Sequence, residues 1–212
     1  IGDSTPPTIT GVSIAPNNST ITVTFSEAVF DTNGGSGALE VSDFVLSISG
    51  GTATVGATPI SISQSGGQYT LTLDSLASTA DSNEVLTVVP SSSTAIYDAA
   101  GNAASTIQSN NTVSLNDTTP PTLTSVSIDS DNASITVTFN EPVFSTNGGS
   151  GALEVSDFAL ATSGGTATIS PTPSSISQVS SQYTLTLSLT GTPHGNETLI
   201  VVPATSTAIY DA

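Results

Sequence analysis

Residues Thr20–Phe25 read Thr-Ile-Thr-Val-Thr-Phe, and this stretch decides the fold. Its apolar side chains stand at every second position, and all six residues are β-branched or aromatic. A period of two in such residues is typical of a β-strand with one face toward a core. Residues Ser134–Phe139 read Ser-Ile-Thr-Val-Thr-Phe, 114 positions later. The sequence therefore predicts a β domain that occurs twice.

A short seam marks the passage from one copy to the next. Residues 115–122 read Leu-Asn-Asp-Thr-Thr-Pro-Pro-Thr, and residues 1–8 read Ile-Gly-Asp-Ser-Thr-Pro-Pro-Thr. Both stretches contain an acidic residue, two hydroxyl residues and a Pro-Pro pair. We therefore divide the 212 residues into repeat 1 at 1–116 and repeat 2 at 117–212. Each has a size common for an independently folding β domain.

Further apolar segments lie between turn signals. In repeat 1 they are residues 9–14, 44–48, 52–55, 60–62, 69–73, 86–89 and 106–115. Residues 39–43 fit a turn as well as a strand, and Gly50-Gly51 is a hairpin signal. No helical period is present. We predict an all-β fold of tandem immunoglobulin-like β-sandwiches with about seven strands each, without the Cys and Trp of antibody domains.

Repeat 2 is shorter than repeat 1. Tyr210-Asp211 matches Tyr97-Asp98, but repeat 2 has no counterpart of residues 100–116, so we expect it to lack its last strand. Either the sequence is part of a longer array, or a neighbouring molecule donates the strand. Only Ile1 and Gly2 precede the first seam, too few for a donor strand, which favours the longer array.

The charge is entirely one-sided. The chain has no Lys or Arg and seventeen acidic residues, a formal net charge of -17. Binding to nucleic acid or to an anionic membrane surface needs basic residues, so both partners are excluded. No apolar run approaches the roughly 20 residues of a membrane span, so we expect no membrane insertion. The absence of cysteine excludes disulfides and thiolate sites. The charged partners that remain are cations.

Most acidic residues recur between the repeats. The six equivalent pairs are Asp3 with Asp117, Glu27 with Glu141, Glu40 with Glu154, Asp43 with Asp157, Glu84 with Glu197, and Asp98 with Asp211. Strand direction indicates which of them meet. The first strand leaves the N-terminal end of a module and the second returns to it, which brings Glu27 back beside Asp3. The last strand must run away from that end to reach the next seam, so Asp98 and Asn102 precede it there.

These residues predict a calcium site. Carboxylate and amide oxygens without a basic neighbour suit Ca²⁺, which accepts six to eight oxygens in flexible geometry. We expect Asp3, Glu27, Asp98 and Asn102 to converge, with Asp43 as a possible addition, and Asp117, Glu141 and Asp211 to do the same in repeat 2. Such a site would stiffen the joint between modules. The alternative is that Asp and Asn cap turns and the Glu is solvated.

Three stretches carry a resemblance to a known family. The seam Asp117–Thr122, the segment Ile135–Val143 and the loop Tyr97–Asn102 resemble bacterial Ig-like repeats, which build giant surface adhesins and extracellular filaments, notably of the Bacteroidota type. The seam is also similar to the calcium-binding linkers of cadherins, although the full cadherin acidic pattern is absent. The resemblance implies a location outside the bacterial cell or on its surface. It also implies a structural role, neighbouring repeats as partners and polymerisation in a filament.

Other functions have weaker signals. A glycan- or cell-binding module acting through the Gly-rich loops 33–37 and 147–151 is the main alternative, with Phe30 and Phe144 as the nearby aromatics. Enzymatic activity is not expected, since the single histidine, His194, lies in a turn without a triad. Asn-X-Ser/Thr sites and Asp74-Ser75-Leu76 fit glycosylation patterns. Asparagines in such sites include Asn18, Asn110, Asn116, Asn132 and Asn196.

Overall fold

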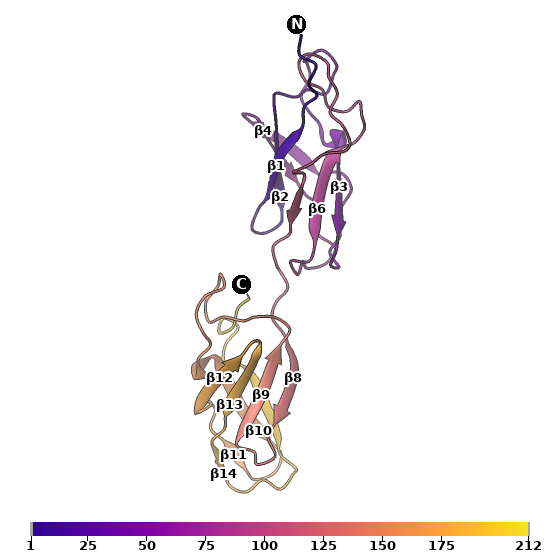
Figure 1. Cartoon of the computed structure of the whole chain (residues 1–212). Coiled ribbons are helices and arrows are strands. Elements are labelled where there is room, and N and C mark those ends of the chain that lie inside the picture. Colours follow the sequence, from indigo (N-terminus) through magenta and orange to yellow (C-terminus); the bar gives the residue numbers. More distant parts are fainter. Residues whose placement is uncertain (1, 212) are drawn as a thin grey trace. The chain divides into compact units, whose positions relative to one another are not determined.

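The computed structural model describes residues 2–211 (Figure 1). The chain forms two compact units, Ile1–Thr119 and Pro120–Ala212, divided three residues after the boundary drawn from the sequence. The fold is all-β, with 40% strand and 3% helix. Within the described residues, no helix has the length and apolar character needed to cross a membrane.

Unit 1 is a sandwich of two antiparallel sheets. The larger sheet has the order β1-β2-β5-β4, and the smaller sheet has the order β3-β6-β7. The strands are β1 (Ile9–Ile14), β2 (Thr20–Phe25), β3 (Phe44–Ser49), β4 (Ser61–Ser65), β5 (Gln68–Thr72), β6 (Val85–Pro90) and β7 (Thr112–Ser114). This division of seven strands into sheets of four and three is that of a constant-type immunoglobulin domain. The predicted immunoglobulin-like sandwich is therefore confirmed for unit 1.

Unit 2 repeats this plan up to its last strand. One sheet has the order β12-β13-β9-β8, β10 pairs with β15, and two short strands, β11 and β14, pair with each other. The strands are β8 (Leu123–Ile128), β9 (Ser134–Phe139), β10 (Phe158–Ser163), β11 (Thr168–Ile169), β12 (Ser175–Val179), β13 (Gln182–Thr186), β14 (Leu189–Thr190) and β15 (Thr198–Pro203). Within the described residues, no strand takes the place that β7 has beside β6.

The alternating residues of the central strands form the core. Ile21, Val23 and Phe25 of β2 are buried, and the threonines between them are half-buried. The ring of Phe25 meets Tyr69 edge-on at 5.8 Å, and unit 2 repeats this contact between Phe139 and Tyr183 at 5.8 Å. These aromatic pairs pack within the core of each unit and add to its stability.

Two local predictions differ from the structure, and one that was left open between turn and strand is decided. Residues 52–55 do not form a strand, because the Thr52 and Ala53 amides donate to the Glu84 carboxylate rather than to a neighbouring strand. The last strand covers only Thr112–Ser114, since turns that include Asn110 at φ 56° precede it. Residues Val41–Asp43 form a 3-10 turn (η1), and η2 (Val155–Asp157) is its counterpart.

The incoming chain and the outgoing seam are attached to opposite ends of unit 1. At one end, Ser26 N donates to Thr8 O at 2.8 Å and Thr8 N to Ser26 Oγ at 3.0 Å. At the other end, Asn18 in the turn after β1 donates through Nδ2 to Asn116 O at 2.8 Å, and Asn116 N donates to Asn18 Oδ1 at 2.9 Å. In unit 1 the chain therefore enters at one end of the sandwich and leaves at the other.

Candidate metal centre

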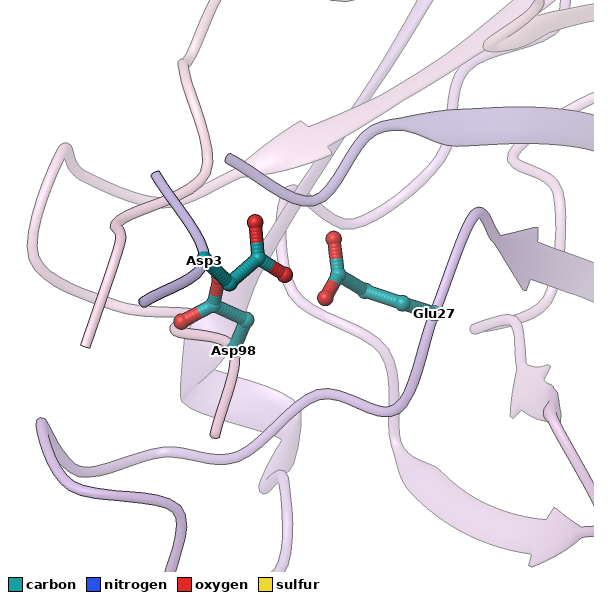
Figure 2. A group of neighbouring side chains, drawn as sticks. All are labelled: Asp3, Glu27 and Asp98. Carbon is teal, nitrogen blue, oxygen red and sulfur yellow. The ribbon is translucent and has the colours of Figure 1, made fainter. Parts of the chain in front are cut away.

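Three carboxylates meet at the N-terminal end of unit 1. Asp3, Glu27 and Asp98 each offer one oxygen, and these oxygens lie within 4.8 Å of one another. Figure 2 shows the three side chains approaching from three separate segments of the chain. Asp3 is exposed, Glu27 is half-buried and Asp98 is fully buried. The strand-direction argument from the sequence therefore places these three residues together as the structure does.

The antiparallel pairing of β1 and β2 sets the positions of Asp3 and Glu27. Because β1 and β2 are antiparallel, Glu27, two residues after β2, returns to the end where Asp3 precedes β1. The Asp3 carboxylate accepts a hydrogen bond from Thr5 N at 3.0 Å, which shapes the backbone before Pro6-Pro7. An Asp that binds the amide two residues later is a common turn device, and it leaves the second carboxylate oxygen available.

The loop before the last strand holds Asp98. Its Oδ1 accepts hydrogen bonds from Ala100 N at 2.9 Å and Asn102 N at 2.7 Å, and its Oδ2 accepts one from Asn102 Nδ2 at 2.6 Å. Asn102 Nδ2 also donates to Asp3 O at 3.2 Å. Asn102 is thus in the group, but it presents its amide nitrogen. In this arrangement it orients Asp98 and ties it to the Asp3 segment.

The carboxylates differ in their ease of ionisation. Burial raises the pKa of Glu27, and the neighbouring charges of Asp3 and Asp98 raise it further. Burial also opposes ionisation of Asp98, but the hydrogen bonds from the Asn102 side chain and from the backbone amides outweigh it and lower the Asp98 pKa. Hydrogen bonds therefore stabilise the Asp98 anion, whereas the charge repulsion within the group raises the pKa of Glu27.

The geometry fits a shared calcium ion. Ca²⁺ binds oxygen at about 2.3–2.6 Å, so two oxygens on one ion are at most about 5 Å apart. The 4.8 Å limit within the group satisfies this condition. The three carboxylates offer one oxygen each, and a Ca²⁺ ion held here would take its remaining ligands from backbone carbonyls or water. A cation would also reverse the two charge effects that raise the Glu27 pKa.

Asp43 does not belong to this group. Its Oδ2 accepts a hydrogen bond from Glu40 N at 2.7 Å, which closes η1 as a capping box. Burial raises the Asp43 pKa, and the charges of Asp31 and Glu40 contribute to the rise. Asp157 makes the same bond with Glu154 in unit 2, at 2.8 Å. This repeated pair therefore has a structural role at the start of a strand.

The predicted residues of the second site are distributed over both units. Asp117 belongs to unit 1 and accepts a hydrogen bond from Thr119 N at 2.8 Å, the same turn that Asp3 makes with Thr5. Glu141, two residues after β9, and Asp211 belong to unit 2 and are both half-buried. The convergence of these three residues stays a prediction from the sequence repeat.

A second repeated pair of glutamates, Glu84 and Glu197, has a structural role that no sequence motif indicates. Glu84 is fully buried and accepts hydrogen bonds from Thr52 N at 2.9 Å, Ala53 N at 3.0 Å and Asp81 N at 3.0 Å. Glu197 accepts the equivalent bonds from Thr166 N at 3.1 Å, Ala167 N at 3.3 Å and His194 N at 2.9 Å. The sequence signal for these carboxylate sites was the glycine pair before each receiving loop, Gly50-Gly51 and Gly164-Gly165. All four glycines have positive φ.

The Gly-rich loops are closed on themselves. Thr32 Oγ1 donates to Ser36 O at 2.5 Å, and Thr146 Oγ1 donates to Ser150 O at 2.5 Å. The nearby Phe30 is half-buried, and its backbone pairs with Tyr97.

Among the candidate glycosylation sites, Asn18 is only 3% exposed and bonded to Asn116, so its amide is closed to modification.

No family model and no curated protein sequence matches the chain. Solved structures of a bacterial S-layer protein, SbsC, are similar to it. Its N-terminal part is 18% identical at a TM-score of 0.40, covering 94% of this chain and 44% of that one. Domains 1–6 are 17% identical at a TM-score of 0.40, covering 94% of this chain and 26% of that one. This chain thus spans less than half of either structure.

Proposed function

We propose that the chain is a structural module of an extracellular surface protein, an adhesin stalk or a filament of the bacterial cell surface. Its tandem sandwiches act as spacers that set the reach of the protein, and calcium stiffens the joints between them. Neighbouring repeats of the same protein are its partners. The chain has no Lys or Arg, so trypsin has no site to cleave. This resistance suits a protein that is exposed to extracellular proteases.

The observation that carries this proposal is the anchoring of the seam from both sides. In unit 1, Thr118 N donates to Ala80 O at 2.9 Å and Thr119 Oγ1 to Ala80 O at 2.8 Å. In unit 2, Thr122 N donates to Asn140 Oδ1 at 2.6 Å. Between these anchors lie only Pro120 and Pro121, whose rings fix φ and restrict the preceding residue. A joint this short and restricted suits a spacer.

Calcium is assigned to the N-terminal end of each module. The group Asp3, Glu27 and Asp98 stands where the chain enters unit 1. Its counterparts by sequence are Asp117, Glu141 and Asp211, and we propose that they bind a second ion. An ion bound there would link the seam to the module that follows and reduce bending at the joint. Removal of calcium would leave the proline pair and the hydrogen-bonded anchors of the seam to restrict the joint.

The adhesive alternative has less support. A glycan platform is typically built from exposed aromatic faces, whereas Phe30 and Phe144 are both half-buried beside the Gly-rich loops. Tyr69 and Tyr183 are buried, and each donates its hydroxyl to a backbone carbonyl. The structural role is therefore proposed first.

The test is the distribution of distances between the two units. Because the chain has no cysteine, the exposed Ser65→Cys and Ser177→Cys provide a unique pair of spin-label positions. We expect a narrow distribution in calcium and a broader one after chelation. A variant with Pro120→Gly and Pro121→Gly should be broad in both conditions. A wild-type distribution as broad as that of the glycine variant in calcium would refute the spacer proposal.

A further inference from the structure

The four-stranded sheet of each unit ends in a strand that nothing covers. In unit 1 this strand is β4, the last in the order β1-β2-β5-β4, and β12 has the same place in unit 2 (Figure 1). Within residues 2–211, no further strand pairs with the outer side of either one. Both strands carry the sequence Ser-Ile-Ser-Gln, at residues 61–64 and 175–178. The same uncovered edge is therefore present in both repeats.

The outer side of β4 presents backbone groups without partners. Thr72 O accepts a hydrogen bond from Ile60 N at 2.9 Å, so the Thr72 carbonyl of β5 faces β4. Ser61 is the register partner of Thr72, and bonded pairs recur at every second residue of an antiparallel ladder. The N–H and C=O groups of Ile62 and Gln64 therefore point away from β5. No other described segment bonds to them.

Two other sheet edges of unit 1 are protected. In β3, Leu46 N donates to Ala57 O at 2.8 Å, so the following loop covers that strand. In β1, the register shifts between Ile9 and Gly11, and Ile9 N donates to Gln108 Oε1 at 2.8 Å. Covering segments and bulges are ways in which proteins keep edge strands from pairing with other chains. By contrast, β4 pairs regularly with β5 along its whole length and has no proline or charged residue.

The distribution of charge indicates the partner. The chain has no acidic residue between Asp43 and Asp74 and none between Asp157 and Glu197, although its net charge is -17. The edge strands β4 and β12 lie within these two neutral stretches. Two copies of a strongly acidic chain repel each other least where such stretches meet, whereas a basic partner would bind to the acidic loops. A second copy of the chain is therefore the partner that this edge fits.

We propose that two copies of the chain join through β4, with the two strands antiparallel about a two-fold axis at Ser63. In this register, Ile62 N donates to Gln64 O of the second copy, and Gln64 N of the second copy donates to Ile62 O. The axis repeats these two bonds on the other side of Ser63. An interface in which the same patch serves both partners is the usual form of a symmetric pair. β12 offers the same contact, centred on Ser177.

The side chains of β4 suit this register. Ser61, Ser63 and Ser65 are exposed on the outer face of the sheet. Within unit 1, Ser61 Oγ donates to Thr72 Oγ1 across two strands at 2.7 Å. In the joined sheet, Ser63 lies opposite Ser63 of the second copy, where two hydroxyls make the same kind of cross-strand contact. Small side chains at this position also let the two backbones approach to pairing distance.

The contact deepens the proposed structural function, because it names a surface through which copies associate side by side. It uses neither calcium nor the seam. Each contact is small, so its affinity should be weak, with a Kd on the order of 0.1 mM. In an array, many repeats would add such contacts, and the combined affinity would exceed that of one.

The first test is sedimentation of the whole chain in a calcium chelator. The chain should be a monomer at about 10 µM and should associate reversibly above about 0.1 mM. Added NaCl should strengthen the association, since salt screens the repulsion between acidic copies. Because calcium is absent, failure of this test would leave the calcium-stiffened joint standing. Failure of the calcium test would likewise leave this contact standing.

A cysteine variant tests the register. The chain has no cysteine, and a two-fold axis at Ser63 places the two Ser63 Cα atoms about 4.5 Å apart, as in a non-hydrogen-bonded pair. This distance suits a disulfide, so Ser63→Cys should form a covalent dimer with diamide as oxidant. Ser65→Cys is the matched control on the same face of β4. Ser65 lies opposite Ser61 of the second copy and about 14 Å from its own counterpart, so it should cross-link at least tenfold more slowly.

Charge variants locate the surface in both units. Ser63→Asp combined with Ser177→Asp places two carboxylates opposite each other at each contact and should weaken association at least tenfold. Ser13→Asp combined with Ser127→Asp is the matched control. Ser13 is an exposed serine in the same row of register partners as Ser63, but at the β1 edge, and Ser127 has this place on β8. The control adds the same charge, so it should change association by less than twofold. Thermal unfolding should show that both variants fold.

Three outcomes would overturn the proposal. The first is a chain that stays monomeric up to about 1 mM. The second is equal cross-linking of Ser63→Cys and Ser65→Cys, which would indicate random collision. The third is association that the variant of Ser63 and Ser177 leaves unchanged, or that the variant of Ser13 and Ser127 weakens as much. That result would place the contact on another surface or reduce it to a general effect of charge.

Discussion

Glu84 illustrates how a single carboxylate supports the fold of unit 1. It is fully buried, and its two oxygens satisfy three backbone amides from two separate loops. No basic residue balances this charge, so backbone N–H groups alone stabilise it. Hydrogen bonds to a charged group are stronger than neutral ones, and a buried amide left without an acceptor is costly.

Glu84→Gln should therefore destabilise unit 1 by about 2 kcal/mol. Glutamine keeps one acceptor oxygen, but its NH₂ group faces the Asp81 amide, so two donors oppose each other. Chemical unfolding at neutral pH measures the loss. Glu197→Gln is the matched control, because it should lower only the transition of unit 2. An unchanged transition of unit 1 in Glu84→Gln would show that the carboxylate is dispensable.

The same residue predicts a pH dependence. Its hydrogen bonds lower the Glu84 pKa from 4.5 to about 2 in the folded state, although burial opposes this. Between pH 4.5 and about 2 the unfolded chain therefore binds more protons, and the free energy of unfolding falls as the pH falls. In Glu84→Gln, the loss of stability of unit 1 over this range should be smaller. Parallel pH profiles of the wild type and the variant would contradict this assignment.

Glu27 should behave in the opposite way. Burial and the charges of Asp3 and Asp98 raise its pKa, so its anion is disfavoured in the folded state without a cation. Glu27→Gln should raise the unfolding temperature of unit 1 slightly in a chelator and abolish any rise caused by calcium. Calorimetry with and without chelator tests both effects. A fall in the chelator would mean that Glu27 stabilises unit 1 by other contacts.

The elements of the fold differ in how well the sequence predicts them. Alternation of apolar residues and threonines in Thr20–Phe25 requires one buried face, and the strand forms as predicted. Residues 52–55 alternate as well, but the Glu84 carboxylate takes their first two amides. The direction of strands brings Asp3, Glu27 and Asp98 together, whereas the orientation of the Asn102 amide depends on hydrogen bonds that no sequence pattern shows.

The open edge of β15 gives a prediction for hydrogen exchange. In β6, Val88 N points away from β3 and donates to Asn111 O. By the same alternation, the amides of Leu199 and Val201 point to the open edge of β15, and those of Ile200 and Val202 point toward β10. We expect fast exchange at Leu199 and Val201 and slow exchange at Ile200 and Val202. In β6, Val88 bonds to Asn111, so its amide should be protected. Measurement by NMR tests this alternation, and uniform protection along β15 would contradict an open edge.

At the scale of the whole molecule, the two units should not be equally stable. The last strand of unit 1 buries Leu115 and covers Leu86, whereas Leu199 stays half-buried in unit 2. Complete burial of one leucine contributes about 1.5–3 kcal/mol. For a domain of this size, that difference lowers the unfolding temperature by roughly 10 °C. Calorimetry should therefore resolve two transitions, with unit 2 first. A reversed order would mean that the last strand adds little.

The most direct test of the proposed function is the thermal unfolding of the chain with and without calcium, with magnesium as the control. Calcium at about a hundred times its Kd should stabilise unit 1 by about 2.7 kcal/mol, and magnesium should have a much smaller effect because it demands stricter geometry. A rise specific to calcium that is lost in Glu27→Gln is the result expected for an ion held by Asp3, Glu27 and Asp98. An unfolding temperature that calcium leaves unchanged would contradict the calcium-stiffened joint and leave a spacer restricted by its prolines and the hydrogen-bonded anchors of the seam.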